Sequence, residues 1–311
     1  MDNTEQEQLT GLGATGLLLV ILLLSVLNPG VVVATSFLWL VVIFGMTRWI
    51  GLGMAVVAGT IVMFIPGTGE LWYLERSWSV LLAGCFVTIT MMFPSAVFFN
   101  RALGSLCVML IMVGVFFASN FQYWYIMDGI MNQNIMNNIT RSLLMFSDVD
   151  SDLMASEVFR DRAMELAGYQ FRFFPALLAL SSLASMAVAW WGYVGLSGKG
   201  LRNLKGLNQF KFNDHLVWCL IVGLLVVFWD FSDGWSRIGE NLVVFMTALY
   251  VMRGMAVVFV TTGMLFFGKM SLFLGLILLG PLLLLIAFVI GLSDIWFDYR
   301  NRVRILKKSN Q

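Results

Sequence analysis

The sequence predicts an all-α fold, a polytopic transmembrane helical bundle with about eight or nine membrane segments. Apolar residues make up 59% of the 311 residues and charged residues 12%, against ~25% charged residues in an average soluble domain. The apolar residues also fall in runs of roughly 15 to 27, and a helix needs ~20 residues to cross a ~30 Å hydrocarbon core. We therefore expect a single integral membrane domain over residues 1–311, with the lipid bilayer as its surroundings.

Glycine, proline and charged residues separate the apolar runs. Asn28-Pro29-Gly30 follows the first run, Thr47-Arg48 follows the second, and Pro66-Gly67 ends the third. Several runs are shorter than an average span, so we expect some of them to be short or partly re-entrant. The runs cover residues 11–27, 31–46, 50–65, 79–99, 105–118, 175–196, 216–229, 242–267 and 271–292.

The long polar section, residues 119–174, is expected to lie outside the cytoplasm between two membrane segments. It opens with aromatic and amide residues and continues through an acidic stretch at 148–152. Apolar residues then recur at helical spacing, with charges between them, which predicts an amphipathic helix on the membrane or over the bundle. The apolar positions are Leu153, Val158, Ala163, Leu166 and Phe173.

Two basic segments give conflicting evidence on topology. The loop 197–211 and the tail 293–311 both predict a cytoplasmic location, yet three apolar runs separate them. Either one run is not a simple crossing or one basic segment breaks the rule. The run that holds Arg253 is the first suspect, because Gly254 beside a charge is a natural place to interrupt a helix. Counting back from the loop places the N-terminus in the cytoplasm.

Arg253 is the main candidate for a ligand-binding residue, because it is the only charge between Leu242 and Gly268. It stands about 14 residues, roughly 20 Å, from the end of its run, too far for its side chain to reach water. A charge at that depth costs ~2.5–3.5 kcal/mol and needs a partner. No acid lies within the neighbouring runs, so the nearest candidates are Asp230, Asp233, Glu240, Asp128 and backbone carbonyls. Arg253 is then either an anion-binding or coupling cation in a central cavity, or a structural arginine that ties helix ends together.

The amide-rich stretch after the fifth run supplies further candidate ligand-binding residues, namely Asp128, Asn132 and Asn134. Three aromatic residues, Tyr123 to Tyr125, precede them. Aromatic and amide side chains suit recognition of a small polar molecule, but an interfacial belt is the favoured interpretation.

Enzymatic, metal and nucleic-acid functions are not expected. The chain has no P-loop, HExxH or GxSxG motif and no paired carboxylates at catalytic spacing within the membrane runs. Its lone histidine, His215, cannot form a two-histidine metal or haem site, and its three cysteines are expected to be buried free thiols. The net charge of +1 does not favour nucleic acid, and we expect no cofactor.

The segment GLSDIWFDYRNR (291–302) is the most distinctive of the chain, and it resembles the end motif of the YybS-like family of uncharacterised bacterial membrane proteins. Residues 241–258 and 215–223 are similar to further segments of that family, so the resemblance covers 215–302 well and the rest loosely. The family more often has a neutral polar residue where this chain has Arg253, so a function of Arg253 would be peculiar to this member.

The resemblance implies a multi-pass protein of the bacterial inner membrane. The family is distantly similar to the S components of energy-coupling factor transporters. This implies an S-component-like fold, a cavity for a small solute and a first helix that docks a transmembrane coupling protein. The small residues of the first run, which let helices approach closely in lipid, are the candidates for that contact or for an ordinary intramolecular one. They are Gly11, Gly13, Ala14 and Gly16.

The end motif can also be interpreted physically. Asp294 and Asp298 are four residues apart, as are Asp298 and Arg302, so one helical face alternates acid and base. The motif predicts either a helix end anchored at the membrane interface, which is favoured, or a docking surface for a partner. The docking candidates are Asp294, Trp296, Asp298 and Arg300.

Two hypotheses follow. The first is a non-enzymatic membrane protein that binds a small solute or helps to transport it across the bacterial inner membrane. The second is a structural or assembly subunit of a membrane protein complex.

Overall fold

The computed structural model describes residues 27–45, 48–64, 71–147, 157–197, 212–229, 233–262, 280–299 and 302. Their regular secondary structure is helical, and no strand occurs among them, which confirms the predicted all-α class. The chain divides into two compact units. One is Ile21–Gly200, and the other joins Met1–Val20 to Leu201–Gln311.

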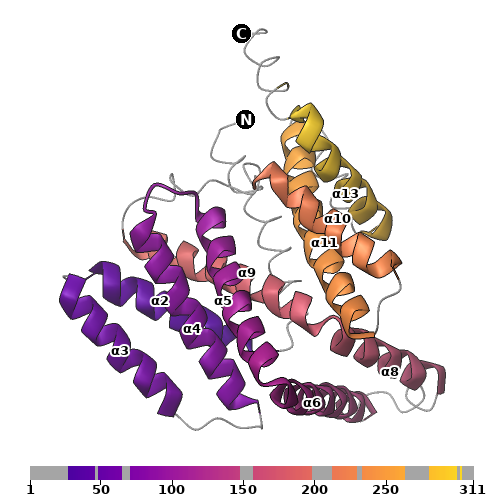
Figure 1. The fold of residues 1–311 in the computed structure, drawn as a ribbon, viewed down its shortest axis with the longest axis horizontal. Helices are drawn as coiled ribbons and strands as arrows, with labels where there is room; N and C mark the ends of the chain where they lie inside the picture. The colour runs from indigo at the N-terminus through magenta and orange to yellow at the C-terminus, as the bar shows by residue number, and fades with distance from the viewer. Residues whose placement is uncertain are drawn as a thin grey trace. The chain divides into compact units, whose positions relative to one another are not determined.

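The described helices of the unit Ile21–Gly200 run along the chain from α2 to α9 (Figure 1). The helix α2 packs against α3, α4 and α9, while α5 packs against α4 and α9. The helices are α2 (Pro29–Gly45), α3 (Arg48–Phe64), α4 (Trp72–Met92), α5 (Phe98–Ser119), α6 (Phe121–Ser147), α8 (Glu157–Arg172) and α9 (Phe174–Leu196).

Proline sets two of the boundaries in this unit. Pro29 is the first residue of α2. Proline has no backbone N–H, and at this position of a helix an N–H would have no acceptor within the helix. The preceding residue caps the helix, since Asn28 Oδ1 accepts a hydrogen bond from Gly30 N at 3.0 Å. The predicted run 79–99 crosses Pro94, but α4 ends at Met92 and α5 begins at Phe98. The predicted end of that run is therefore wrong. The apolar residues continue past the proline, but the helix stops before it.

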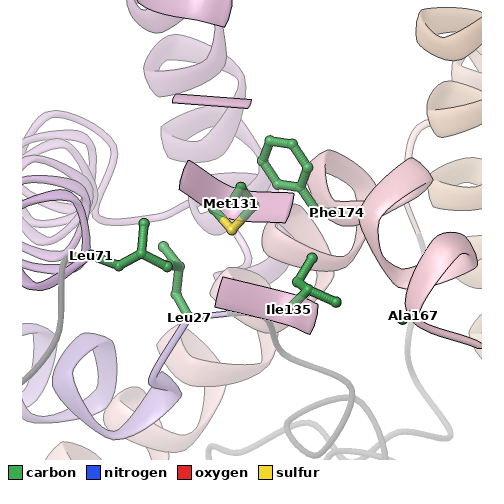
Figure 2. Packing of buried hydrophobic residues seen from close by; sticks show 6 residues of the cluster. All are labelled: Leu27, Leu71, Met131, Ile135, Ala167 and Phe174. Carbon is green, nitrogen blue, oxygen red and sulfur yellow. The ribbon is translucent and has the colours of Figure 1, made fainter. Parts of the chain in front are cut away.

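The polar section 119–174 is helical where it is described. The helices α6 and α8 pack against each other. Met131 and Ile135, one turn apart on α6, share a buried cluster with Ala167 of α8 and with Phe174 (Figure 2). The helix α8 covers Glu157–Arg172 of this section, and Leu166 is 65% exposed on it while Ala167 is buried. The amphipathic helix on the membrane or over the bundle stays a prediction. The acidic stretch 148–152 lies outside the described residues.

The second unit is a smaller group of helices in which α11 packs against both α10 and α13 (Figure 1). Its elements are η3 (Asp214–Leu216), α10 (Val217–Phe228), α11 (Asp233–Thr262) and α13 (Gly280–Phe297). Glycines make both contacts close. A Cβ on Gly239 would lie 3.1 Å from Gly223 O of α10, and a Cβ on Gly254 would lie 2.9 Å from Gly291 N of α13.

The predicted interruption at Gly254 is wrong, because α11 runs unbroken through Arg253 and Gly254. Gly254 instead lies where α11 crosses α13. Small residues at such crossings let two backbones approach closely within a membrane, where helices gain little from apolar side chains.

Three helices of the described residues are long and apolar enough to cross a membrane, judged by length and composition. They are Phe98–Ser119, Phe174–Leu196 and Gly234–Val258, and shorter apolar helices cover Pro29–Gly45, Gly53–Phe64, Asp214–Phe228 and Leu282–Phe297. The first predicted run, 11–27, lies almost entirely outside the described residues. The count of eight or nine membrane segments therefore stays a prediction.

Candidate functional site

Arg253 is fully buried on α11 and forms two ion pairs. Its Nε donates to Asp294 Oδ2 at 2.9 Å, and its Nη1 donates to Asp214 Oδ1 at 2.7 Å. The side chains of Arg253 and Asp294 have no exposed surface, whereas 45% of the Asp214 side chain is exposed. One guanidinium thus joins the start of η3 to the end of α13, and only the Asp214 end of this triad meets solvent.

The end of α13 positions Asp294. Its second oxygen, Oδ1, accepts a hydrogen bond from the backbone N–H of Tyr299 at 3.1 Å. The chain can fold back in this way because Asp298, the residue after the helix, has a φ of 40°, the left-handed conformation that commonly ends helices. A carboxylate near a helix C-terminus is unfavourable on its own, and Arg253 offsets that repulsion.

The short helix η3 presents the other carboxylate. Asn213 precedes it, and Asn213 Oδ1 accepts a hydrogen bond from His215 N at 3.1 Å, a side-chain cap on the first turn. This cap orders the turn that carries Asp214. His215 itself is exposed.

Aromatic rings line the buried side of the triad. The guanidinium carbon of Arg253 lies 5.4 Å from the centre of the Phe212 ring, within the range of a cation–π interaction. Phe212 meets the edge of Tyr250 at 5.2 Å, and Tyr250 meets Phe288 at 6.4 Å. The ion pairs therefore lie against an apolar wall that excludes water and strengthens them.

Two hydrogen-bond donors at this site have no acceptor among the described residues. They are Arg253 Nη2 and the hydroxyl of Tyr250, both buried. Tyr250 and Arg253 stand three residues apart on α11, so they share one face of the helix. A buried polar group without a partner costs ~1–3 kcal/mol, which an oxygen atom of a bound molecule would relieve.

The close crossing of α11 and α13 at Gly254 and Gly291 brings Arg253 within reach of Asp294. A Cβ on Gly254 would collide with the carbonyl oxygen of Ala287, and one on Gly291 would collide with that of Tyr250. Because the two backbones touch here, the side chain of Arg253 extends to Asp294 without crossing a gap.

The predicted partners of Arg253 are wrong. The helix α13 continues to Phe297, beyond the apolar run that ends at 292, so Asp294 is an acid within a neighbouring helix. The helix α11 begins at Asp233, before the apolar run that starts at 242, and the depth of Arg253 in the membrane stays a prediction. An apolar run does not define the ends of a helix, because a helix continues through polar residues that find partners.

The amide-rich residues of α6 belong to the other unit. Asp128, Asn132 and Asn134 are half-buried, and Asn134 Nδ2 donates to Ile130 O of its own helix at 2.9 Å. Their predicted role in ligand binding stays a prediction. Of the predicted docking residues, Trp296 is exposed, Asp298 is half-buried and Asp294 is held in the triad. Gly11, Gly13, Ala14, Gly16 and Arg300 lie outside the described residues.

The three cysteines are free, as predicted, but none of them is fully buried, so the prediction that they are buried is wrong. Cys107 is exposed on α5, and Cys85 and Cys219 are partly buried.

Comparison with known protein families identifies the family of this chain. The model of a family described as "Predicted membrane protein (DUF2232)" matches residues 16–295. No curated protein and no solved structure matches the chain.

Proposed function

We propose, from the premise that the chain belongs to this family of predicted membrane proteins, that it binds a small polar solute and helps to transport it, without enzymatic activity. The proposal includes an S-component-like fold, as the YybS-like resemblance implies. It also places the protein in the bacterial inner membrane with a cytoplasmic N-terminus, which reporter fusions to each end of the chain would test.

The pair of buried donors on α11 carries this proposal. Arg253 Nη2 and the Tyr250 hydroxyl have no acceptor among the described residues, and oxygen atoms of a bound solute would satisfy them. Buried polar groups in proteins are nearly always satisfied, so each orphan donor calls for a specific explanation.

The charges of the triad restrict the solute. Two carboxylates share one guanidinium, which leaves a formal net charge of −1. An anion of high charge would be repelled, so the site favours a neutral or zwitterionic solute with a carbonyl or carboxylate oxygen. Because Asp214 is the exposed member, we place the entry of the solute on its side of the triad.

The decisive variant is Tyr250→Phe, which removes one donor and keeps the buried ring. We expect native mass spectrometry to find a small molecule on the gently purified wild-type protein and to find it lost or reduced about tenfold on the variant. Tyr193→Phe, at another buried tyrosine in the other unit, is the matched control and should retain the molecule. A wild-type protein without any small molecule, or equal retention by both variants, would contradict the proposal.

An assembly subunit is the second candidate, and the outer face of α5 favours it. Val108, Ile111 and Val115 form an exposed apolar stripe at helical spacing along the candidate span Phe98–Ser119. Another membrane subunit or lipid would cover this stripe. Protein subunits that co-purify in fixed stoichiometry, without a small molecule, would favour assembly over solute binding.

A further inference from the structure

The triad of Asp214, Arg253 and Asp294 leaves one carboxylate oxygen open. Asp214 Oδ1 accepts from Arg253 Nη1 at 2.7 Å, whereas Oδ2 accepts no hydrogen bond from the described residues. Asp294 differs, because Arg253 donates to its Oδ2 and Tyr299 N donates to its Oδ1. Since 45% of the Asp214 side chain is exposed, its open oxygen is accessible to a cationic group of a solute.

The donors without acceptors lie close to this carboxylate. Arg253 Nη1 and Nη2 are bonded to the same guanidinium carbon, so an oxygen bound at Nη2 lies beside a group bound at Asp214. The Tyr250 ring and the guanidinium both pack around Phe212. The centre of the Phe212 ring lies 5.2 Å from that of Tyr250 and 5.4 Å from the guanidinium carbon. The site therefore presents hydrogen-bond donors and a carboxylate within one small region.

The charges of the triad favour an acceptor that brings a cation with it. Two carboxylates and one guanidinium give a formal charge of −1, so a simple monocarboxylate would raise it to −2. Like charges repel strongly where water is largely excluded. A zwitterion leaves the formal charge at −1, and its ammonium pairs with Asp214. A neutral carbonyl satisfies the donors, but a carboxylate is the better match for a guanidinium.

We propose that the solute is a zwitterionic amino acid, an inference that rests on the proposed function. Its carboxylate would accept from Arg253 Nη2 and the Tyr250 hydroxyl, and its ammonium would donate to Asp214 Oδ2. The two charges must stand only a few bonds apart, because the groups that bind them meet at one guanidinium. An α-amino acid has that spacing, whereas a simple carboxylate or a simple amine lacks one of the two groups.

The test compares three small probes on the ligand-free, full-length protein. L-alanine carries both charged groups, propionate lacks the ammonium, and ethylamine lacks the carboxylate. Thermal unfolding in mild detergent is measured with each probe at the same millimolar concentration, since a ligand that binds the folded protein raises its unfolding temperature. We expect L-alanine to bind about tenfold more tightly than either analogue, because each analogue loses a charged hydrogen-bonded contact.

Asp214→Asn separates recognition of the ammonium from a structural role of this residue. Asparagine keeps an oxygen that can accept from Arg253 Nη1, but it has no charge to pair with an ammonium. We expect the preference for L-alanine over propionate to fall about tenfold. Asp161→Asn is the matched control at an exposed acid of α8 in the other unit, and it should keep the preference. The comparison of probes on the wild-type protein holds even if Asp214→Asn fails to fold.

Several outcomes would overturn the amino-acid assignment. They are no stabilisation by L-alanine, equal stabilisation by propionate, and an unchanged preference in Asp214→Asn. All three leave the proposed function standing, because its failure is the absence of any small molecule on the gently purified protein. Where such a molecule is found, dansyl chloride should label an amine on it, and a molecule without an amine also overturns the assignment.

Discussion

Gly254 of α11 and Gly291 of α13 lie in backbone contact beside the buried ion pair between Arg253 and Asp294. The two features depend on each other. The close crossing lets the arginine reach the carboxylate, and the ion pair fixes which faces of the two helices meet. Changes at either feature should therefore weaken the same pair of helices.

Gly254→Ala should destabilise the protein strongly. The new Cβ would overlap the carbonyl oxygen of Ala287, and backbone cannot move aside as a flexible side chain can. We expect a loss of ~3 kcal/mol or more in the free energy of unfolding, at or above the usual cost of overpacking, measured by thermal unfolding in mild detergent. Gly234→Ala is the control on the same helix, because no atom of the described residues lies within 4 Å of its Cβ position, and a similar loss there would refute the crossing.

Breaking the buried ion pair should cost more than removing both charges. Asp294→Asn or Arg253→Gln alone leaves a buried charge without one of its partners, and we expect a loss of ~3–5 kcal/mol in each case. The double variant should lose clearly less than the sum of the single losses.

The exposed pair between Arg162 and Glu165, which joins at 2.9 Å on α8, is the reference for this measurement. Glu165→Gln should change the free energy of unfolding by less than ~1 kcal/mol, since water screens such pairs. Additive losses in the Arg253 and Asp294 cycle would mean that the two side chains do not interact.

Tyr250→Phe should leave the ligand-free protein as stable as the wild type, or stabilise it by up to ~1 kcal/mol. The hydroxyl has no partner among the described residues, so its removal takes away a buried polar group and no hydrogen bond. Thermal unfolding of the delipidated, ligand-free protein checks this. A marked loss of stability would show that the hydroxyl has an acceptor in the folded protein.

The core between α4 and α9 offers a paired test with two buried serines. Trp78 Nε1 donates to Ser182 Oγ at 2.9 Å, so Ser182→Ala leaves an indole N–H unsatisfied and should cost ~1–3 kcal/mol. Ser36 of α2 is equally buried, but its hydroxyl has no partner in the described part of the chain, and Ser36→Ala should be neutral or slightly stabilising. Equal effects of the two substitutions would contradict this assignment of hydrogen bonds.

The sequence predicts the helical class and the approximate place of most helices, because long apolar runs separated by proline, glycine and charge suffice for that. It does not predict where helices end. The helix α13 passes through Asp294, whose charge is stabilised by an arginine 41 residues away. No local pattern carries that information.

The candidate site could be predicted only in part, because local sequence patterns do not show which distant residues pair. Arg253 stood out as a lone charge in an apolar run, and Asp294 stood out in a distinctive motif, but nothing in either segment linked the two. Asp214 is not among the predicted partners of Arg253, because it precedes an apolar run and resembles any polar residue at a helix start. The glycines at positions 254 and 291 were the available signal, since each stands within about one helical turn of a member of the pair.

The ion pair between α11 and α13 also constrains how the protein is made. Arg253 leaves the ribosome 39 residues after Asp214 and 41 residues before Asp294, so its exposed partner is made before it and its buried partner after it. If α13 entered lipid alone, the charge of Asp294 would cost up to ~2.5–3.5 kcal/mol. The favourable route is for α11 to stay beside the translocon until α13 arrives, so that Asp294 enters the bilayer already paired with Arg253.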